Sequence, residues 1–169
     1  METERRRIVV RPYRAGDRDE VLALAPRLTE GVAAWREAGA VAEAVVGWVT
    51  GSLERAARGD AGVFVAECDG RVAGFVTVTV RAHFTGQLDG YIGELAVAPD
   101  ATGRGAGRAL VAAAEGWARD RGLENVVLET GAANRQALGF YRALGYVAEE
   151  VRLRRPVGAP GPAVREPLG

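Results

Sequence analysis

Apolar and polar positions in the middle of the chain follow the pattern of a β-hairpin. Residues 63–67 form an apolar-rich arm, and residues 71–81 form a second arm in which valines alternate with other side chains. Asp69 and Gly70 lie between the arms, and an Asp-Gly pair supplies the positive φ angles of a tight turn. The pattern therefore predicts an antiparallel hairpin.

Shorter apolar runs predict the remaining strands, and helical spacing predicts the helices. Strands are expected at 8–11, at 91–97 as the central strand, and at 126–128, with an extended segment at 146–155. The first expected helix is capped by Asp17 and disturbed at Pro26, and the region 33–58 is expected to form two short helices or one bent helix. A further helix is expected over 107–121, and the last is capped by Asn134 and ends at Gly145.

This order of elements is typical of one mixed α/β domain, because strands and helices alternate after a central meander. A chain of 169 residues can bury about 70% of its surface without disulfides or metals. We expect a single domain over 1–155. Four of the seven prolines fall within 156–169, which predicts a poorly ordered tail.

Charge and composition exclude several classes of function. The 22 basic and 22 acidic residues balance, which removes the broad positive field that nucleic-acid or anionic-membrane binding needs. Every basic residue is arginine, so a lysine Schiff base and a Walker A loop are excluded. Cys68 and His83 stand alone, which argues against disulfides and a metal centre. With no long apolar run, we expect a soluble cytoplasmic protein without metal, membrane or nucleic-acid partners.

The strongest functional signal lies in residues 91–107, YIGELAVAPDATGRGAG, where a strand, a glycine-rich turn and a helix start follow one another. Gly103, Gly105 and Gly107 allow close approach of a ligand, and a helix N-terminus favours phosphate oxygens. Taken alone, the same spacing equally suits a loop that merely needs permissive residues. The dinucleotide fingerprint Gly-x-Gly-x-x-Gly is not completed, which disfavours a dinucleotide enzyme.

This segment resembles the acetyl-CoA motif of the GCN5-related N-acetyltransferase (GNAT) family, which is Gln/Arg-x-x-Gly-x-Gly/Ala between a strand and a helix. Gly105 and Gly107 match the motif, and Thr102 stands where the family prefers Gln or Arg. A second family motif resembles NRQALGFYRALGY, with matches at Asn134, Ala137, Phe140, Tyr141, Gly145 and Tyr146. The resemblance covers about residues 8–153.

The resemblance implies a mixed, mostly antiparallel sheet with a splayed central strand and helices on both faces. It also implies that acetyl-CoA is a co-substrate and that an amine attacks it directly in a ternary complex. Main-chain groups of Leu95 and Val97 are expected to pair with the pantetheine arm, and the amides of 103–108 to hold the pyrophosphate. The implied CoA contacts are Leu95, Ala96, Val97, Thr102, Gly103, Arg104, Gly105, Ala106, Gly107, Arg108, Asn134 and Tyr141.

Two side chains have implied catalytic roles. Tyr141 corresponds to the family's tyrosine that protonates the CoA thiolate, and this role is favoured over the alternative of one more aromatic residue on an apolar helix face. Glu94 is the first candidate for a base, which is needed because an amine with a pKa of about 10.4 is protonated at neutral pH. Its alternative role is to bind a cationic acceptor. His83 is the second candidate base.

Other residues and functions stay open at this stage. Trp35 and Trp48 belong to a region that forms part of the acceptor wall in the family, but their spacing favours the core. The alternative function is a non-catalytic acyl-CoA-binding or sensory domain. The acceptor is a small-molecule or peptide amine. The family usually has two strands after its second motif, so the last strand is here absent, merged or supplied by another subunit, which would be a homodimer.

Overall fold

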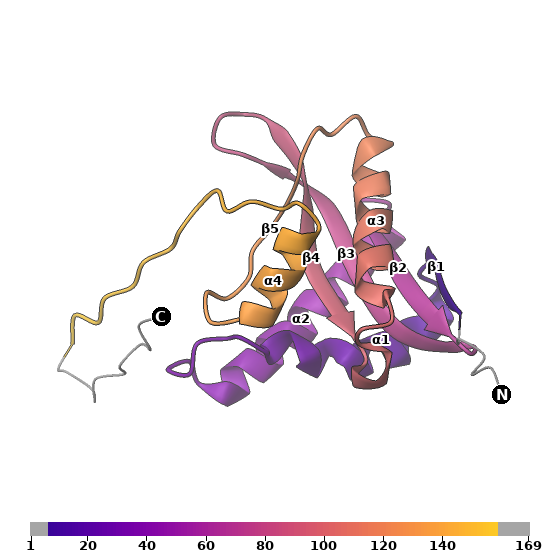
Figure 1. Ribbon diagram of the computed structural model, residues 1–169, viewed down its shortest axis with the longest axis horizontal. Coiled ribbons are helices and arrows are strands. Elements are labelled where there is room, and N and C mark those ends of the chain that lie inside the picture. Colours follow the sequence, from indigo (N-terminus) through magenta and orange to yellow (C-terminus); the bar gives the residue numbers. More distant parts are fainter. Residues whose placement is uncertain (1–6, 159–169) are drawn as a thin grey trace.

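The computed structural model describes residues 7–158, which form a five-stranded sheet with helices on both faces (Figure 1). The strands are β1 (Ile8–Pro12), β2 (Ala61–Cys68), β3 (Arg71–Ala82), β4 (Leu88–Val97) and β5 (Val126–Leu128), and they lie in this order across the sheet. Neighbouring strands are antiparallel except β4 and β5, which are parallel. The predicted mixed, mostly antiparallel sheet is confirmed.

The hairpin of β2 and β3 forms around the predicted turn. Asp69 and Gly70 have φ angles of 53° and 77°, as a two-residue turn of this kind requires. The strand predicted at 126–128 is likewise found at those residues, as β5. Local turn chemistry and apolar run length were therefore sufficient to locate these elements.

The helices divide between the two faces of the sheet. On one face lie α1 (Arg18–Leu24), the 3-10 turn η2 (Ala25–Thr29) and α2 (Ala38–Ala57), which pack on Val65, Phe75 and Ala96. On the other face lies α3 (Ala106–Arg119), which packs on Val76, Val78 and Ile92, with Phe140 and Tyr141 of α4 (Arg135–Ala143) against its edge (Figure 1). Each face of the sheet therefore has its own apolar core.

The region 33–58 differs from its prediction. One unbroken helix, α2, runs through Gly39, Gly47 and Gly51, where breaks were expected. The Glu37 carboxylate caps its start by accepting the N–H groups of residues 39 and 40. Each interior glycine costs about 1 kcal/mol relative to alanine. Burial of apolar side chains along the helix, at about 1.5–3 kcal/mol each, outweighs this cost.

The two tryptophans of this region lie at the surface, so their expected core placement is wrong. Trp35 precedes α2 and is 47% exposed, and Trp48 is 54% exposed. The buried stripe of α2 contains Val45, Val49 and Leu53. Trp48 lies at the border of this stripe, because neighbouring helix residues are rotated by about 100°.

Asp17 is also used differently from its prediction, because its side chain does not cap α1. Its carboxylate accepts two hydrogen bonds from Arg11, at 2.8 and 2.9 Å, and one from the Arg14 N–H. It therefore joins β1 to the turn before α1. The expected disturbance at Pro26 is confirmed, since α1 ends at Leu24 and a 3-10 turn follows.

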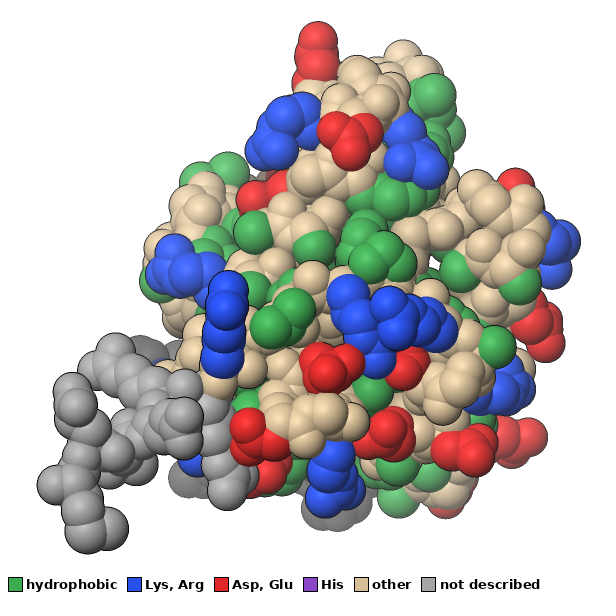
Figure 2. Space-filling model, turned by 90° about the vertical axis from the view of Figure 1, so that its right-hand side faces the viewer, with side chains coloured by type: hydrophobic (Ala, Val, Ile, Leu, Met, Phe, Trp, Pro, Cys, Tyr) green, Lys and Arg blue, Asp and Glu red, His purple; other side chains and the backbone are tan. Residues whose placement is uncertain are grey.

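Residues 144–158 follow α4 and contain no helix or strand, although an extended segment was predicted at 146–155. β5 therefore has only β4 as a strand neighbour among the described residues. Most of the predicted tail, 159–169, lies outside the described residues. Between residues 7 and 158, no helix combines the length and apolar character needed to cross a membrane. On the face shown in Figure 2, acidic and basic side chains are interspersed.

Candidate active site

β4 has different neighbours along its two edges. β3 pairs with it as far as Val97, whereas β5 pairs only with residues 90–92. β5 ends at Leu128 and the chain then continues to α4, so β4 from Gly93 onward has an open edge within the described chain. The predicted splay is therefore present at β4, although β4 is the fourth of the five described strands and not the central one, which is β3.

The main chain of Leu95 and Val97 faces this open edge. The N–H groups of Glu94 and Ala98 donate to groups of β3, at 3.1 and 2.8 Å. Successive residues of a strand direct their main-chain groups to opposite sides, so those of 95 and 97 point away from β3. Arg27 of η2 donates from Nε to the Val97 carbonyl at 3.2 Å, which is consistent with that direction.

A cluster of unbonded amide N–H groups adjoins the open edge. Gly103 and Gly105 have φ angles of 77° and 87°, which favour glycine strongly. In the described chain, no acceptor bonds the N–H groups of residues 103, 105, 106, 107 and 108. These N–H groups and the dipole of α3 together favour a phosphate group.

The side chains around this turn have separate functions. Arg104 and Arg108 are exposed and add positive charge beside the free N–H groups. The Thr102 hydroxyl donates to the Ala98 carbonyl at 3.2 Å, so it closes the turn. Ala106 is buried and can offer a ligand only its main chain, and Ala96 directs its side chain into the core beneath α2. The main-chain groups of Ala96 face β3, as those of residues 94 and 98 do, so Ala96 does not line the open edge.

Tyr141 lies on α4 with its ring packed against the α3 core and its ring centroid 5.0 Å from that of Phe140. Burial raises the pKa of Tyr141 to about 12. No described group hydrogen-bonds its hydroxyl, and every fully buried side-chain oxygen or nitrogen in the described chain has a partner. The hydroxyl is therefore accessible while the ring is packed, and it carries its proton at neutral pH.

Asn134 joins the start of α4 to the segment before α2. Its Oδ1 accepts the Ala137 N–H at 3.0 Å, which confirms the predicted cap, and its Nδ2 donates to the Glu30 carbonyl at 3.3 Å. Gly31 and Gly131 permit this approach, because a Cβ on Gly131 would lie 2.1 Å from the Gly31 carbonyl oxygen. The segment that precedes α2 and the segment that precedes α4 are thus in direct contact.

Glu94 is buried, with 6% of its surface exposed. Its Oε2 accepts hydrogen bonds from Ser52 Oγ of α2, at 2.8 Å, and from Thr77 Oγ1 of β3. Arg55 donates to Ser52 Oγ at 2.8 Å. Burial raises the pKa of Glu94, although these two hydroxyl bonds and the charge of Arg55 act in the opposite direction. Sequence reasoning identified Glu94 but not its partners.

The structure does not bring His83 to Glu94. His83 lies in the loop joining β3 and β4, where its Nδ1 is 2.7 Å from Thr85 Oγ1. Glu94 lies six residue steps along extended β4 from Leu88, the first residue of that strand, which corresponds to about 20 Å. His83 is therefore poorly placed to share a proton with the same substrate.

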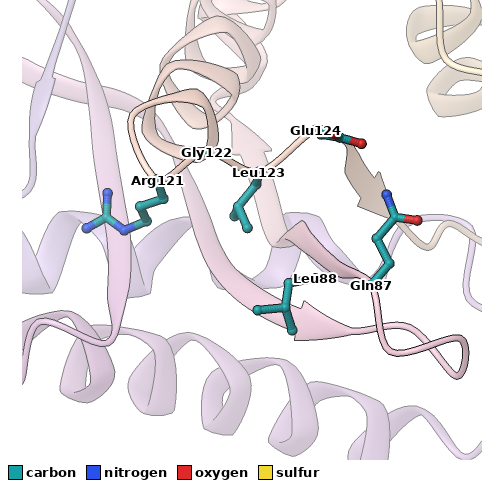
Figure 3. A pocket seen from close by; sticks show the side chains of 6 residues that line it. All are labelled: Gln87, Leu88, Arg121, Gly122, Leu123 and Glu124. Atoms are coloured by element: carbon teal, nitrogen blue, oxygen red, sulfur yellow. The ribbon is translucent and has the colours of Figure 1, made fainter.

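A shallow depression lies near the other end of β4 (Figure 3). Its volume is about 450 Å³, and Leu88 and Leu123 point into it from β4 and from the segment after α3. The glycine turn lies at the opposite end of α3, and the 14 residues of that helix span about 20 Å. This depression is thus separate from the open edge of β4.

The model of the acetyltransferase (GNAT) family matches residues 34–146, more than half of the chain. The chain belongs to the GNAT acetyltransferase family. The resemblance inferred from two short motifs is therefore confirmed, and so is the fold that it implied.

Two curated relatives are longer proteins that are named as acetyltransferases. A mycothiol acetyltransferase of Cellulomonas flavigena is 39% identical over 115 residues, which are 64% of this chain and 33% of the relative. An uncharacterized N-acetyltransferase of Methanocaldococcus jannaschii is 36% identical over 96 residues, which are 56% of this chain and 42% of the relative. The chain spans about a third of the length of the mycothiol acetyltransferase that it matches.

Solved GNAT structures share the fold. A GCN5-related N-acetyltransferase from Ralstonia eutropha has a TM-score of 0.71 at 24% identity, covering 90% of this chain and 100% of the other. An aminoglycoside N-acetyltransferase, AAC(6')-Iy, in complex with CoA has a TM-score of 0.70 at 18% identity, covering 94% of this chain and 100% of the other. At these identities the likeness concerns the fold alone.

Proposed function

We propose that this protein is an acetyl-CoA-dependent N-acetyltransferase that acts on an amine by direct attack. The observation that carries the proposal is the cluster of unbonded N–H groups at 103–108 next to the open edge of β4. This arrangement suits a ligand that has a phosphate group followed by an amide-bearing arm, which is the chemistry of CoA. Family membership supports acetyl transfer as the reaction.

In this proposal the main chain positions acetyl-CoA. The N–H groups of the glycine turn bind the pyrophosphate, with Arg104 and Arg108 beside it. The Leu95 and Val97 main chain pairs with the pantetheine amides along the open edge. The Leu95 N–H also polarises the thioester carbonyl, because it points into the same gap. Holding the thioester and the amine together is the largest contribution to the rate.

Two side chains move protons in the proposed reaction. Glu94 accepts a proton from the amine, directly or through water, and its raised pKa makes it a stronger base than an exposed glutamate. The new C–N bond forms while the C–S bond breaks. Tyr141 then donates its hydroxyl proton to the CoA thiolate, and its raised pKa ensures that the proton is present at neutral pH.

We propose a small-molecule amine as the acceptor. Tyr91 adjoins the hydroxyl that bonds Glu94, since a Cβ on Gly93 would lie 3.1 Å from Thr77 Oγ1 and 3.9 Å from Tyr91 Cε1. Arg81 stacks over Tyr91 at 4.5 Å and pairs with Glu129 at 3.0 Å. These groups form a polar floor beside the base that suits an acceptor with several polar substituents. The names of the mycothiol and aminoglycoside acetyltransferases point in the same direction.

The test is acetyl-CoA turnover across a panel of amines, with the released CoA thiol as readout. The panel contains amino sugars, polyamines, amino acids and lysine peptides. We expect thiol release with at least one small polar amine and none without an amine. Binding of acetyl-CoA without release for any amine would contradict the enzyme and favour a non-catalytic acyl-CoA-binding domain.

We also propose a homodimer in which residues 147–157 of each copy pair with the β5 edge of the other. Val147, Val151, Leu153 and Val157 are 81–97% exposed and share one side of an extended chain. This segment leads away from the sheet (Figure 1), and β5 offers an unpaired edge within the described chain. A two-fold pair of copies covers both edges with identical contacts.

Light scattering after gel filtration tests the dimer. The parent chain should have twice the 17.8 kDa monomer mass, and the double variant Val151→Asp, Leu153→Asp should be monomeric. The control Glu150→Gln, Arg152→Gln changes the opposite side of the segment and should stay dimeric. A parent that is monomeric at micromolar concentration contradicts this arrangement.

The cytoplasmic location expected from the sequence stays a prediction.

A further inference from the structure

Two hydroxyl groups from different elements bond the same oxygen of Glu94. Ser52 Oγ of α2 lies 2.8 Å from Glu94 Oε2, and Thr77 Oγ1 of β3 also bonds Oε2. Both Ser52 and Thr77 are 1% exposed. A hydroxyl has one proton to donate, so the direction of each bond depends on what else that hydroxyl contacts.

Arg55 decides the direction of the Ser52 bond. Its Nη2 lies 2.8 Å from Ser52 Oγ, one turn away on α2. A guanidinium has only donors, so Ser52 must accept from Arg55 and has its own proton left for Glu94. The Ser52 hydroxyl therefore donates to the carboxylate.

The main chain of Glu94 decides the direction of the Thr77 bond. The Glu94 N–H donates to Thr77 Oγ1 at 3.1 Å. The β3–β4 register shifts here, between Val76 and Val78, so the Thr77 hydroxyl receives an N–H that the irregular ladder does not pair. Since that hydroxyl accepts one bond from Glu94, its proton is directed to Oε2 of the same residue.

The second oxygen, Oε1, is left free of these bonds. No described group hydrogen-bonds it, and every fully buried side-chain oxygen or nitrogen in the described chain has a partner. Oε1 is therefore the accessible part of an otherwise buried side chain. Its ionisable neighbours are Arg55 of α2 and Tyr91 of β4 itself, with Arg81 of β3 and Glu129 beyond the Tyr91 ring.

We propose that Ser52, Thr77 and Arg55 are positioning residues that fix Glu94 Oε2 and present Oε1 as the atom that takes the proton. This inference rests on the proposed role of Glu94 as the base. The amine N–H bond breaks and an O–H bond forms at Oε1, while both hydroxyl bonds to Oε2 persist. Proton uptake thus requires no rearrangement of the buried network.

The network also sets the pH at which the base works. Hydroxyl bonds to a carboxylate favour its charged form, so they lower the pKa that burial raises. Ser52→Ala removes one of these bonds. The pKa of Glu94 should then rise further, by roughly half a unit to one unit. The acidic limb of the kcat/KM profile should move to higher pH by the same amount.

The experiment measures the Glu94 carboxyl titration by carbon-13 NMR alongside the pH profile of kcat/KM. Parent, Ser52→Ala, Ser52→Thr and Arg55→Met are compared at saturating acetyl-CoA. Ser52→Ala should raise both the Glu94 pKa and the pH of the acidic limb. Ser52→Thr should give the parent's values for both, because it keeps the hydroxyl. Arg55→Met should shift both in the same direction, since it removes a positive charge and frees the Ser52 hydroxyl to turn.

Three results would overturn the inference in distinguishable ways. If Ser52→Ala leaves the titration and the limb unchanged while Glu94→Gln abolishes the limb, Glu94 remains the base and the positioning role is wrong. If the limb persists in Glu94→Gln, the base assignment itself is wrong, and the positioning role fails with it. A loss of kcat in Ser52→Ala without a shift in either pKa would also contradict the inference.

Discussion

Gly107 at the start of α3 and Phe140 of α4 are in direct contact beside the proposed CoA site. A Cβ on Gly107 would lie 3.2 Å from Phe140 Cζ and 3.8 Å from Val97 Cγ2. A side chain at position 107 would therefore press on Phe140, so Gly107 favours this helix packing as well as leaving a free N–H group. The second glycine of the family motif has a structural function that the motif itself does not reveal.

This contact predicts a difference between two glycines of one helix. Gly→Ala inside a helix normally stabilises by about 0.5–1 kcal/mol. Gly116→Ala should do so, because a Cβ at Gly116 meets no atom within 4 Å. Gly107→Ala should gain less or destabilise the protein, because Phe140 must move. Denaturant unfolding measures both, and equal stabilisation would show that Phe140 yields without cost.

The accessible, unbonded hydroxyl of Tyr141 predicts a variant that loses activity and keeps stability. Tyr141→Phe should lower kcat by roughly 10² to 10³, within the range for a general acid, with little change in acetyl-CoA affinity. The control is Tyr146→Phe, in the segment just after α4, whose hydroxyl donates to Glu115 at 2.9 Å. That variant should lose about 1 kcal/mol of stability and little activity. A kcat within about threefold of the parent would make Tyr141 a packing residue.

The buried carboxylate of Asp17 predicts a pH-dependent stability. Hydrogen bonds from Arg11 lower the pKa of Asp17 below its ordinary value of 3.8. A lowered pKa stabilises the fold above the unfolded value, and this contribution is lost as pH falls through the folded value. Asp17→Asn should therefore cost about 1–3 kcal/mol at pH 7. Denaturant unfolding should give a smaller difference from the parent below pH 3.8.

Short-range chemistry made much of the fold predictable. The turn at Asp69 and Gly70 and the cap at Asn134 depend on neighbouring residues only, and both were found as expected. The length of α2 was not predictable in this way, because burial against the sheet outweighs the cost of its glycines. The exposure of Trp48 also depends on which side of α2 the sheet covers.

Only those parts of the candidate site that lie within one sequence motif or one strand could be predicted. The glycine turn and the main chain of β4 are contiguous in sequence. The partners of Glu94 are not, because Ser52 is 42 residues away and Thr77 is 17 residues away. Likewise, Arg27 bonds the carbonyl of Val97 across 70 residues. Such contacts depend on the packing of α2 and η2 on the sheet, and short-range sequence patterns do not predict them.

The base role of Glu94 predicts a pH-dependent loss in Glu94→Gln. At saturating acetyl-CoA, this nearly isosteric change should lower kcat/KM most near pH 7 and progressively less toward pH 9.5, roughly, as neutral amine is supplied from solution. A carboxylate that only binds a cationic acceptor would instead raise KM, with a loss that persists until the amine deprotonates near pH 10, about its ordinary value. Parallel profiles with unchanged kcat would exclude Glu94 as the base.

Acetyl-CoA binding at the glycine turn underlies every step above, and calorimetric titration tests it most directly. The parent should bind CoA and acetyl-CoA and should bind NAD far more weakly. Gly105→Glu and Gly105→Gln share the strain of a positive φ and differ in one charge at the start of α3. The Glu variant should bind CoA about tenfold more weakly than the Gln variant. Absent CoA binding by the parent, tighter binding of NAD, or equal affinities in the two variants would contradict the site.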